Sequence, residues 1–190
     1  MRYYKVLNAD GSTLYGGSFR YDLPHWVGPL DNGHWKPGKW MPKVADIALC
    51  KRGYHACKRN QLVEFLNYGP VIAVIEFRGK VISGDGKVVG ECARITEILP
   101  WDESSARFFA VECAADVLAN FERAFPNDSR VSDCLVVSWM IASGESIDEN
   151  ERSAARSAAE GAAWSAAESA AWSAAMSAQS DRLMFWLGEE

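Results

Sequence analysis

The chain has 190 residues, of which 48% are hydrophobic and 24% are charged, a composition typical of globular proteins large enough to bury a core. The sequence has no long apolar run and begins with a polar, strand-like stretch, so we expect no membrane span and no signal peptide. Its five cysteines are odd in number and lack C-x-x-C spacing. This pattern favours reduced thiols in a cytoplasmic protein, with one disulfide pair as the alternative.

The net charge of −5 is divided unevenly along the chain. Residues 1–99 contain 14 Lys and Arg against 9 Asp and Glu (+5), whereas residues 100–190 contain 6 against 16 (−10). This asymmetry predicts a basic domain over residues 1–99 and an acidic domain over residues 100–190, which either have different partners or attract each other. Solubility is the usual reason for an acidic half.

The first 43 residues contain a predicted hairpin and a long irregular segment. Residues 3–8 alternate apolar and polar side chains before a turn signal at Asp10-Gly11, and residues 13–20 are expected to return as the partner strand. Residues 22–43 are interrupted by Pro and Gly, yet they hold three Trp and two His. Such a segment is either a lid over a ligand or a flap whose aromatic side chains pack onto the core.

A basic turn follows a short strand expected at residues 47–50. Tyr54 and His55 stand between four cations, and basic side chains around an aromatic residue can hold a phosphate or a nucleotide base. In the alternative interpretation, Tyr54 and His55 point inward and the cations are only solvated. The spacing of Cys50, His55 and Cys57 fits no common zinc site, so we expect no metal and no cofactor. The four cations are Lys51, Arg52, Lys58 and Arg59.

The rest of the basic half is predicted to be mostly antiparallel sheet with one short helix. Asn60 can cap a helix over residues 60–66, which Gly69-Pro70 ends. Residues 71–77 are β-branched and almost entirely apolar, as expected of a central strand, and residues 87–99 predict a second long strand.

The acidic half is predicted to be helical. Pro100 marks the boundary, and apolar spacing indicates one helix from Asp102 to Phe125 and a second helix after Asp128 that Gly144 closes. Ser146 and Glu149 have the spacing of a capping box, which predicts the start of a third helix.

That third helix contains a four-residue repeat over residues 153–180, reading SAAR-SAAE-GAAW-SAAE-SAAW-SAAM-SAQS. Ala favours helix, and residues four apart advance by about 40° around a helix, so the bulky fourth positions wind around it. Because the intervening side chains are small, neighbours can approach closely. We expect this helix either to pack on its own domain or to be gripped by partner helices, including those of a second copy of the chain in a homo-oligomer.

A resemblance to the alanine-rich "putative immunity protein" helical module is carried by residues 109–118, 121–122 and 125–130, by Gly144-Glu145 and by the Ala-rich helix. The tandem SAAW and SAAE units resemble versions of that module in bacteriophage proteins. The N-terminal half, with Tyr4-Lys5-Val6 and residues 50–57, is similar to a small uncharacterised phage domain. Residues 22–43 are not covered, and residues 134–141 depart from the usual Ala-rich pattern. The resemblance implies a phage or prophage origin and no particular chemistry.

No catalytic motif is found: the sequence lacks G-x-S-x-G, a P-loop, G-x-G-x-x-G and H-E-x-x-H. We therefore expect a non-enzymatic phage accessory protein, namely a counter-defence inhibitor of the anti-CRISPR type, that binds and occludes a host protein in the host cytoplasm. One alternative is a nucleotide-using enzyme of the ADP-ribosyltransferase type with Tyr54 and His55 near its pocket. Another is nucleic-acid binding through the four cations of the basic turn.

Overall fold

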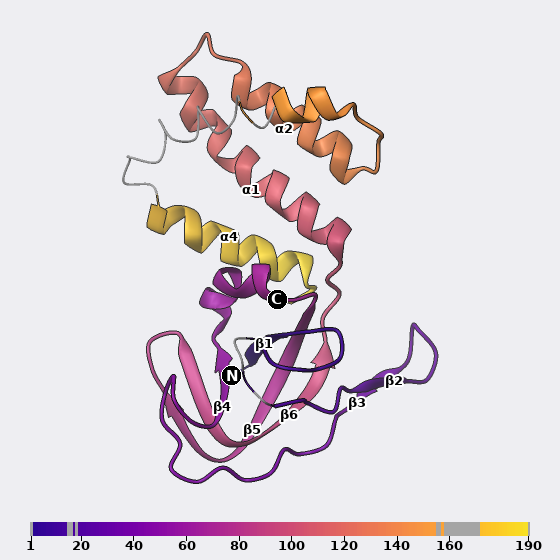
Figure 1. Ribbon diagram of the computed structural model, residues 1–190, viewed down its shortest axis with the longest axis vertical. Coiled ribbons are helices and arrows are strands. Elements are labelled where there is room, and N and C mark those ends of the chain that lie inside the picture. Colours follow the sequence, from indigo (N-terminus) through magenta and orange to yellow (C-terminus); the bar gives the residue numbers. More distant parts are fainter. Residues whose placement is uncertain (1, 15–16, 18, 155–156, 158–171, 190) are drawn as a thin grey trace. The chain divides into compact units, whose positions relative to one another are not determined.

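The computed structural model spans residues 1–190 and describes all of them except residues 1, 15–16, 18, 155–156, 158–171 and 190 (Figure 1). The fold is α+β, with an antiparallel sheet in the first half of the chain and helices in the second half, which confirms the expected class. The chain divides into two compact units. The N-terminal unit contains residues 1–102 and 183–190, and the helical unit contains residues 103–182.

A closed antiparallel sheet forms the N-terminal unit. Its strands follow one another in the order β1-β4-β6-β5 around the sheet. The long strands β5 and β6 confirm the two strands expected at residues 71–77 and 87–99, and β5 extends further than expected. The register of this pair shifts after Arg78, beside Gly79, which has a φ of +86°. The bounds are Tyr3–Leu7 for β1, Tyr54–Cys57 for β4, Val71–Ser83 for β5 and Lys87–Ile98 for β6.

Apolar side chains from all four strands fill the interior of the closed sheet. Because strand side chains alternate between faces, Tyr3 and Leu7 of β1 pack with every second residue of the other strands. Buried members of this core are Leu7, Tyr21, Tyr54, Ala56, Ala73, Ile75, Ala93 and Ile95. A 3₁₀ helix, η1 (Arg59–Tyr68), replaces the short α-helix expected at residues 60–66, and its Leu62 is fully buried.

Three expectations for the first 58 residues were wrong. Residues 13–20 form only isolated bridges among their described positions, because β1 pairs instead with the more apolar β5. Residues 22–43 are not wholly irregular, since β2 (His25–Val27) and β3 (His34–Lys36) pair as a hairpin. Residues 47–50 form a turn rather than a strand, with positive φ values at Asp46 and Cys50.

The helical unit confirms two of the expected helices. Helix α1 (Glu103–Ala124) and helix α2 (Arg130–Ala142) pack on each other, and the ring centroids of Phe108 and Trp139 are 5.0 Å apart. Helix α4 (Trp172–Trp186) is tied to α1 by Arg182, whose guanidinium lies 2.9 Å from Glu112 and 2.6 Å from Asp116.

The third predicted helix is described only at its ends. Residues 149–154 are helical, but Asp148 rather than Ser146 caps them, since the backbone N–H of Asn150 donates to the Asp148 carboxylate at 2.7 Å. Most of the four-residue repeat at 153–180 lies outside the described residues, so its packing and any homo-oligomer through it stay predictions.

The end of the chain differs from the predicted division at residue 100. Residues 183–190 group with the N-terminal unit, whereas the sequence assigned them to the helical domain. Leu183, Met184 and Leu187 are buried, and the carboxylate of Glu189 accepts a hydrogen bond from the Tyr4 hydroxyl at 3.0 Å and lies 2.7 Å from Arg2. The apolar C-terminal segment therefore completes the N-terminal unit.

Candidate binding surfaces of the N-terminal unit

The segment after the β2–β3 hairpin runs along the edge of β6. Strand β4 pairs with residues 87–90 of β6, and the next part of that edge is covered by residues 38–44. Backbone N–H groups of Gly38, Met41 and Val44 donate to the carbonyl oxygens of Ile95, Ala93 and Glu91, respectively, at 2.8–2.9 Å. Because this pairing fixes the backbone, the side chains of residues 40–43 hold defined positions beside the sheet.

The Trp40 ring makes cation–π contacts with the guanidinium groups of two arginines on neighbouring strands. The guanidinium carbon of Arg78 lies 4.7 Å from the centroid of the Trp40 ring, and that of Arg94 lies 4.6 Å from it. Arg94 also forms an ion pair with Glu76 at 2.7 Å. Among the described residues, Arg78 has no carboxylate partner, so its positive charge is positioned by the indole but not neutralised.

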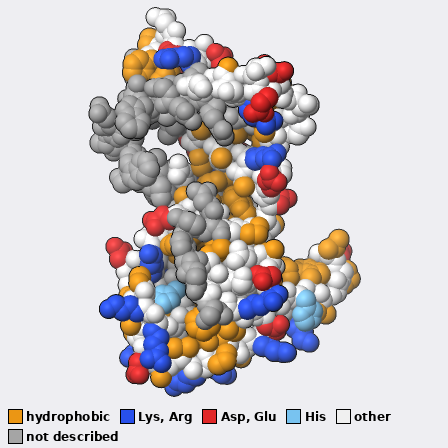
Figure 2. Space-filling model, viewed as in Figure 1, with side chains coloured by type: hydrophobic (Ala, Val, Ile, Leu, Met, Phe, Trp, Pro, Cys, Tyr) orange, Lys and Arg blue, Asp and Glu red, His pale blue; other side chains and the backbone are white. Residues whose placement is uncertain are grey.

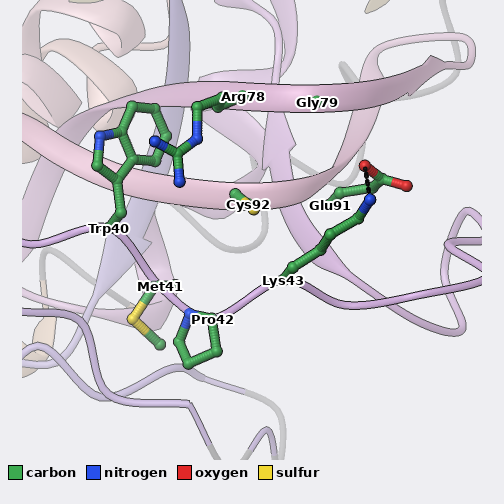
Figure 3. A pocket seen from close by; sticks show the side chains of 8 residues that line it. All are labelled: Trp40, Met41, Pro42, Lys43, Arg78, Gly79, Glu91 and Cys92. Atoms are coloured by element: carbon green, nitrogen blue, oxygen red, sulfur yellow. Dashed lines mark ion pairs between the residues drawn. The ribbon is translucent and has the colours of Figure 1, made fainter.

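A pocket of about 450 Å³ opens beside this pair (Figure 3). Trp40 and Arg78 lie at one end of the pocket, and an ion pair between Lys43 and Glu91, 3.3 Å apart, lies at the other (Figure 3). The lining residues are Trp40, Met41, Pro42, Lys43, Arg78, Gly79, Glu91 and Cys92. The site thus combines an aromatic ring, an ion pair and a guanidinium that no carboxylate among the described residues neutralises.

Glu91 is held in place by two donors. Its carboxylate accepts a hydrogen bond from the backbone N–H of Lys80 at 3.1 Å, in addition to the ion pair with Lys43. The Lys80 hydrogen bond, followed by the contact with Lys43, holds the pKa of Glu91 below its usual range, so this carboxylate stays ionised. The negative charge at this end of the pocket is therefore already compensated.

The basic turn of residues 51–59 does not form one surface around Tyr54. The Tyr54 side chain is only 1% exposed, its hydroxyl donates to the Pro42 carbonyl at 2.8 Å, and its ring lies 4.8 Å from that of Phe19. Burial raises the pKa of its hydroxyl. Tyr54 belongs to the core, as the inward-facing interpretation held, and it cannot stack on a ligand without leaving the core.

His55 and the four cations occupy separate positions. The Nε2 atom of His55 is buried without a hydrogen-bond partner among the described residues, and burial lowers the pKa of the imidazole. The Lys58 ammonium donates to the Gly84 carbonyl at 2.9 Å. Lys51 and Arg52 are exposed in the turn before β4, and Arg59 is exposed at the start of η1, after β4. Strand β4 thus separates the two pairs of cations.

The β2–β3 hairpin extends away from the closed sheet (Figure 1) and carries exposed apolar side chains (Figure 2). Leu30 at its tip is 93% exposed, and Trp26 is 39% exposed. The hairpin is nevertheless well ordered internally: the rings of Trp26 and Trp35 are 5.3 Å apart, and the Trp26 indole N–H donates to the Pro29 carbonyl at 3.1 Å. Residues 22–43 were expected to be either a lid over a ligand or a flap packed onto the core. Neither interpretation describes the whole segment, because Met41 packs against the core while the tip of the hairpin stays exposed.

The described residues contain no group of three or more His, Cys, Asp or Glu side chains placed to hold a metal ion. In the same part of the chain, no helix has the length and apolar character needed to cross a membrane. All five cysteines are free thiols. The chain matches no protein-family model, no curated protein and no solved structure.

The sequence did not single out Arg78 or the pocket. Its residues come from three segments, 40–43, 78–79 and 91–92, that only the strand pairing brings together. The one available signal was the Lys39-Trp40-Met41-Pro42-Lys43 run, in which an aromatic residue lies between two cations.

Proposed function

We propose that the protein is a non-enzymatic binding protein that attaches to a partner protein through the β2–β3 hairpin. The observation that carries this proposal is the exposure of Trp26, Val27 and Leu30 on one projecting, internally ordered arm. Single exposed apolar residues are common on protein surfaces, but a rigid group of them favours an interaction site. Ordering before binding also reduces the entropy lost on association.

The chemistry of the hairpin tip favours a protein over a lipid bilayer. Asp31 follows Leu30 directly and is exposed. Placing its carboxylate in hydrocarbon would cost about 2.5 kcal/mol or more. A partner with an apolar pocket can instead take the Leu30 side chain and leave Asp31 in water. Trp26 would supply the large, rigid contact area typical of residues that dominate binding energy.

The resemblance to phage proteins supports a host protein as this partner, bound in the host cytoplasm, and a counter-defence inhibitor as the functional class. Binding by occlusion needs no catalytic group. The ADP-ribosyltransferase alternative placed Tyr54 beside a nucleotide, and no described feature favours it, because Tyr54 is in the core. Nucleic-acid binding through residues 51–59 has no support from their arrangement either, because strand β4 separates the two cation pairs.

The test is a capture experiment on lysate of a bacterial host with matched variants of the protein. Leu30→Ser removes the tip side chain without touching the core, and Val81→Ser removes another apolar side chain, 39% exposed, from the same unit. We expect a specific partner to be retained by the unmodified protein and by Val81→Ser, and its affinity to fall about tenfold or more with Leu30→Ser. Equal retention by both variants, or the absence of any specific partner, would contradict the proposal.

A further inference from the structure

The Arg78 side chain is a preorganised anion donor. Stacking against Trp40 restricts its rotamers, and no carboxylate among the described residues contacts its guanidinium. A guanidinium offers planar, paired N–H donors that match the two oxygens of a carboxylate or phosphate group. Arg94, held by the same indole, keeps its own carboxylate partner in Glu76. The unsatisfied donors at this site therefore belong to Arg78.

The pocket beside Arg78 is larger than an inorganic anion requires. Its volume of about 450 Å³ falls within the range of small-molecule sites, and the Trp40 ring lines it, whereas the Met41 and Pro42 side chains point to the other side of the segment (Figure 3). Glu91 does not repel an anion at the Arg78 end, because Lys43 and the Lys80 backbone N–H compensate its charge. The two ends of the pocket thus differ. At one end Lys43 and Glu91 form an ion pair, and at the other end the Arg78 guanidinium can donate hydrogen bonds to a ligand (Figure 3).

We propose that this pocket binds a small organic anion, with a carboxylate or phosphate group on Arg78 and an apolar body beside the Trp40 ring. This site is separate from the hairpin tip, and its occupancy does not depend on the partner protein. Carboxylates and phosphates share the pair of oxygen atoms that a guanidinium recognises. Arg78 therefore does not distinguish between these two groups, and the experiment compares their affinities to determine which of them the ligand carries.

The experiment uses three probes with the same ring. Phenyl phosphate and benzoate carry the two anionic groups, and benzyl alcohol is the uncharged control. Each is titrated into the full-length protein at up to about 10 mM, a concentration that detects millimolar affinity, by calorimetry and by the indole N–H signal of Trp40 in NMR spectra. That signal is assigned by its loss in Trp40→Phe, and it reports binding in the unmodified protein.

The variants are Arg78→Gln, which removes the donor fork, and Arg52→Gln, which removes an exposed arginine of the basic turn. Phenyl phosphate or benzoate is expected to bind and to shift the Trp40 signal, while benzyl alcohol does neither. Arg78→Gln is expected to weaken anion binding about tenfold or more, as the loss of a charge-assisted contact implies, with Arg52→Gln unchanged. The tighter of the two anions identifies the head group.

Three results would overturn the proposal. They are no binding of either anion, binding without a shift of the Trp40 signal, and an equal loss of affinity in Arg52→Gln and Arg78→Gln. The last result would move the site to the basic turn or to general charge attraction. Thermal unfolding of each variant shows whether it is folded, and the Trp40 signal of the unmodified protein keeps the proposal testable if Arg78→Gln is not.

Discussion

The buried ammonium group of Lys5 is expected to make the free energy of unfolding depend on pH. Lys5 pairs with Ala73 and lies on the face of β1 that also carries Tyr3 and Leu7, two residues packed against the interior core. Its ammonium donates to the His55 carbonyl at 2.7 Å and lies 5.6 Å from the centroid of the Tyr21 ring. Burial lowers its pKa from 10.5 to about 8, because the charged form is poorly solvated there.

The sign of the pH dependence follows from proton binding. Between pH 8 and 10.5 the unfolded chain keeps the Lys5 proton while the folded protein loses it, so the free energy of unfolding rises with pH. Integrating this difference between about pH 7 and about pH 9 gives a gain of about 1 kcal/mol. Lys5→Met removes the titrating group and fills similar space, so the gain is expected to disappear in this variant.

The measurement is urea-induced unfolding of both proteins at these two pH values. Burial raises the pKa of Cys57 to about 12 and that of Cys113 to about 11, so both thiols oppose the gain at alkaline pH. Both proteins keep these thiols, so the difference between the two pH dependences isolates Lys5. If the two proteins change in parallel from pH 7 to 9, Lys5 is not held in a poorly solvated position and the reasoning fails.

Two further substitutions test other features of the N-terminal unit. Glu189→Gln replaces the partner of Arg2 and Tyr4, so we expect a loss of about 1–3 kcal/mol in the free energy of unfolding. Removing the Glu189 charge is also expected to lower the pKa of Tyr4 from its raised value of about 12, which a phenolate absorbance titration measures. An unchanged Tyr4 pKa would mean that burial alone raises it. Gly38→Ala would place a methyl group 1.8 Å from the backbone carbonyl oxygen of Asp22, so we expect a loss of about 1–3 kcal/mol, seen as a lower urea midpoint. A midpoint equal to that of the unmodified protein would show that Gly38 does not pack closely against the backbone of Asp22.

The sequence predicted best the elements that a strong local pattern of side chains defines. The run from Val71 to Phe77 is apolar except for the exposed Glu76, and in the structure its Ile72 and Ile75 are both buried. Helices α1 and α2 were predicted because their apolar spacing and the residues that end them agreed. In each case the local pattern alone defined the type of element, and for the two helices it also defined the approximate bounds, whereas β5 continues to Ser83.

Pairing between distant segments explains the failures. Local turn chemistry at Asp10-Gly11 predicted that β1 would pair with residues 13–20, but β5 offered five aligned partners and a larger apolar surface. Likewise, the Pro and Gly residues of 22–43 were read as breakers. Gly28 instead has a φ of +101°, in a turn that allows β2 and β3 to pair.

The basic turn shows why composition alone gives no binding site. Tyr54, His55 and their four neighbouring cations are close in sequence, yet β4 alternates its side chains between two faces, so adjacent residues point in opposite directions. Tyr54 therefore enters the core while the cations stay near the surface. By contrast, Trp40 and Arg78 are far apart in sequence and meet because residues 38–44 pair with β6, which also pairs with β5. A cation gains directional donor geometry from the neighbour that fixes its side chain, so the stacked Arg78 is a better anion donor than the exposed Lys51 and Arg52 of the turn.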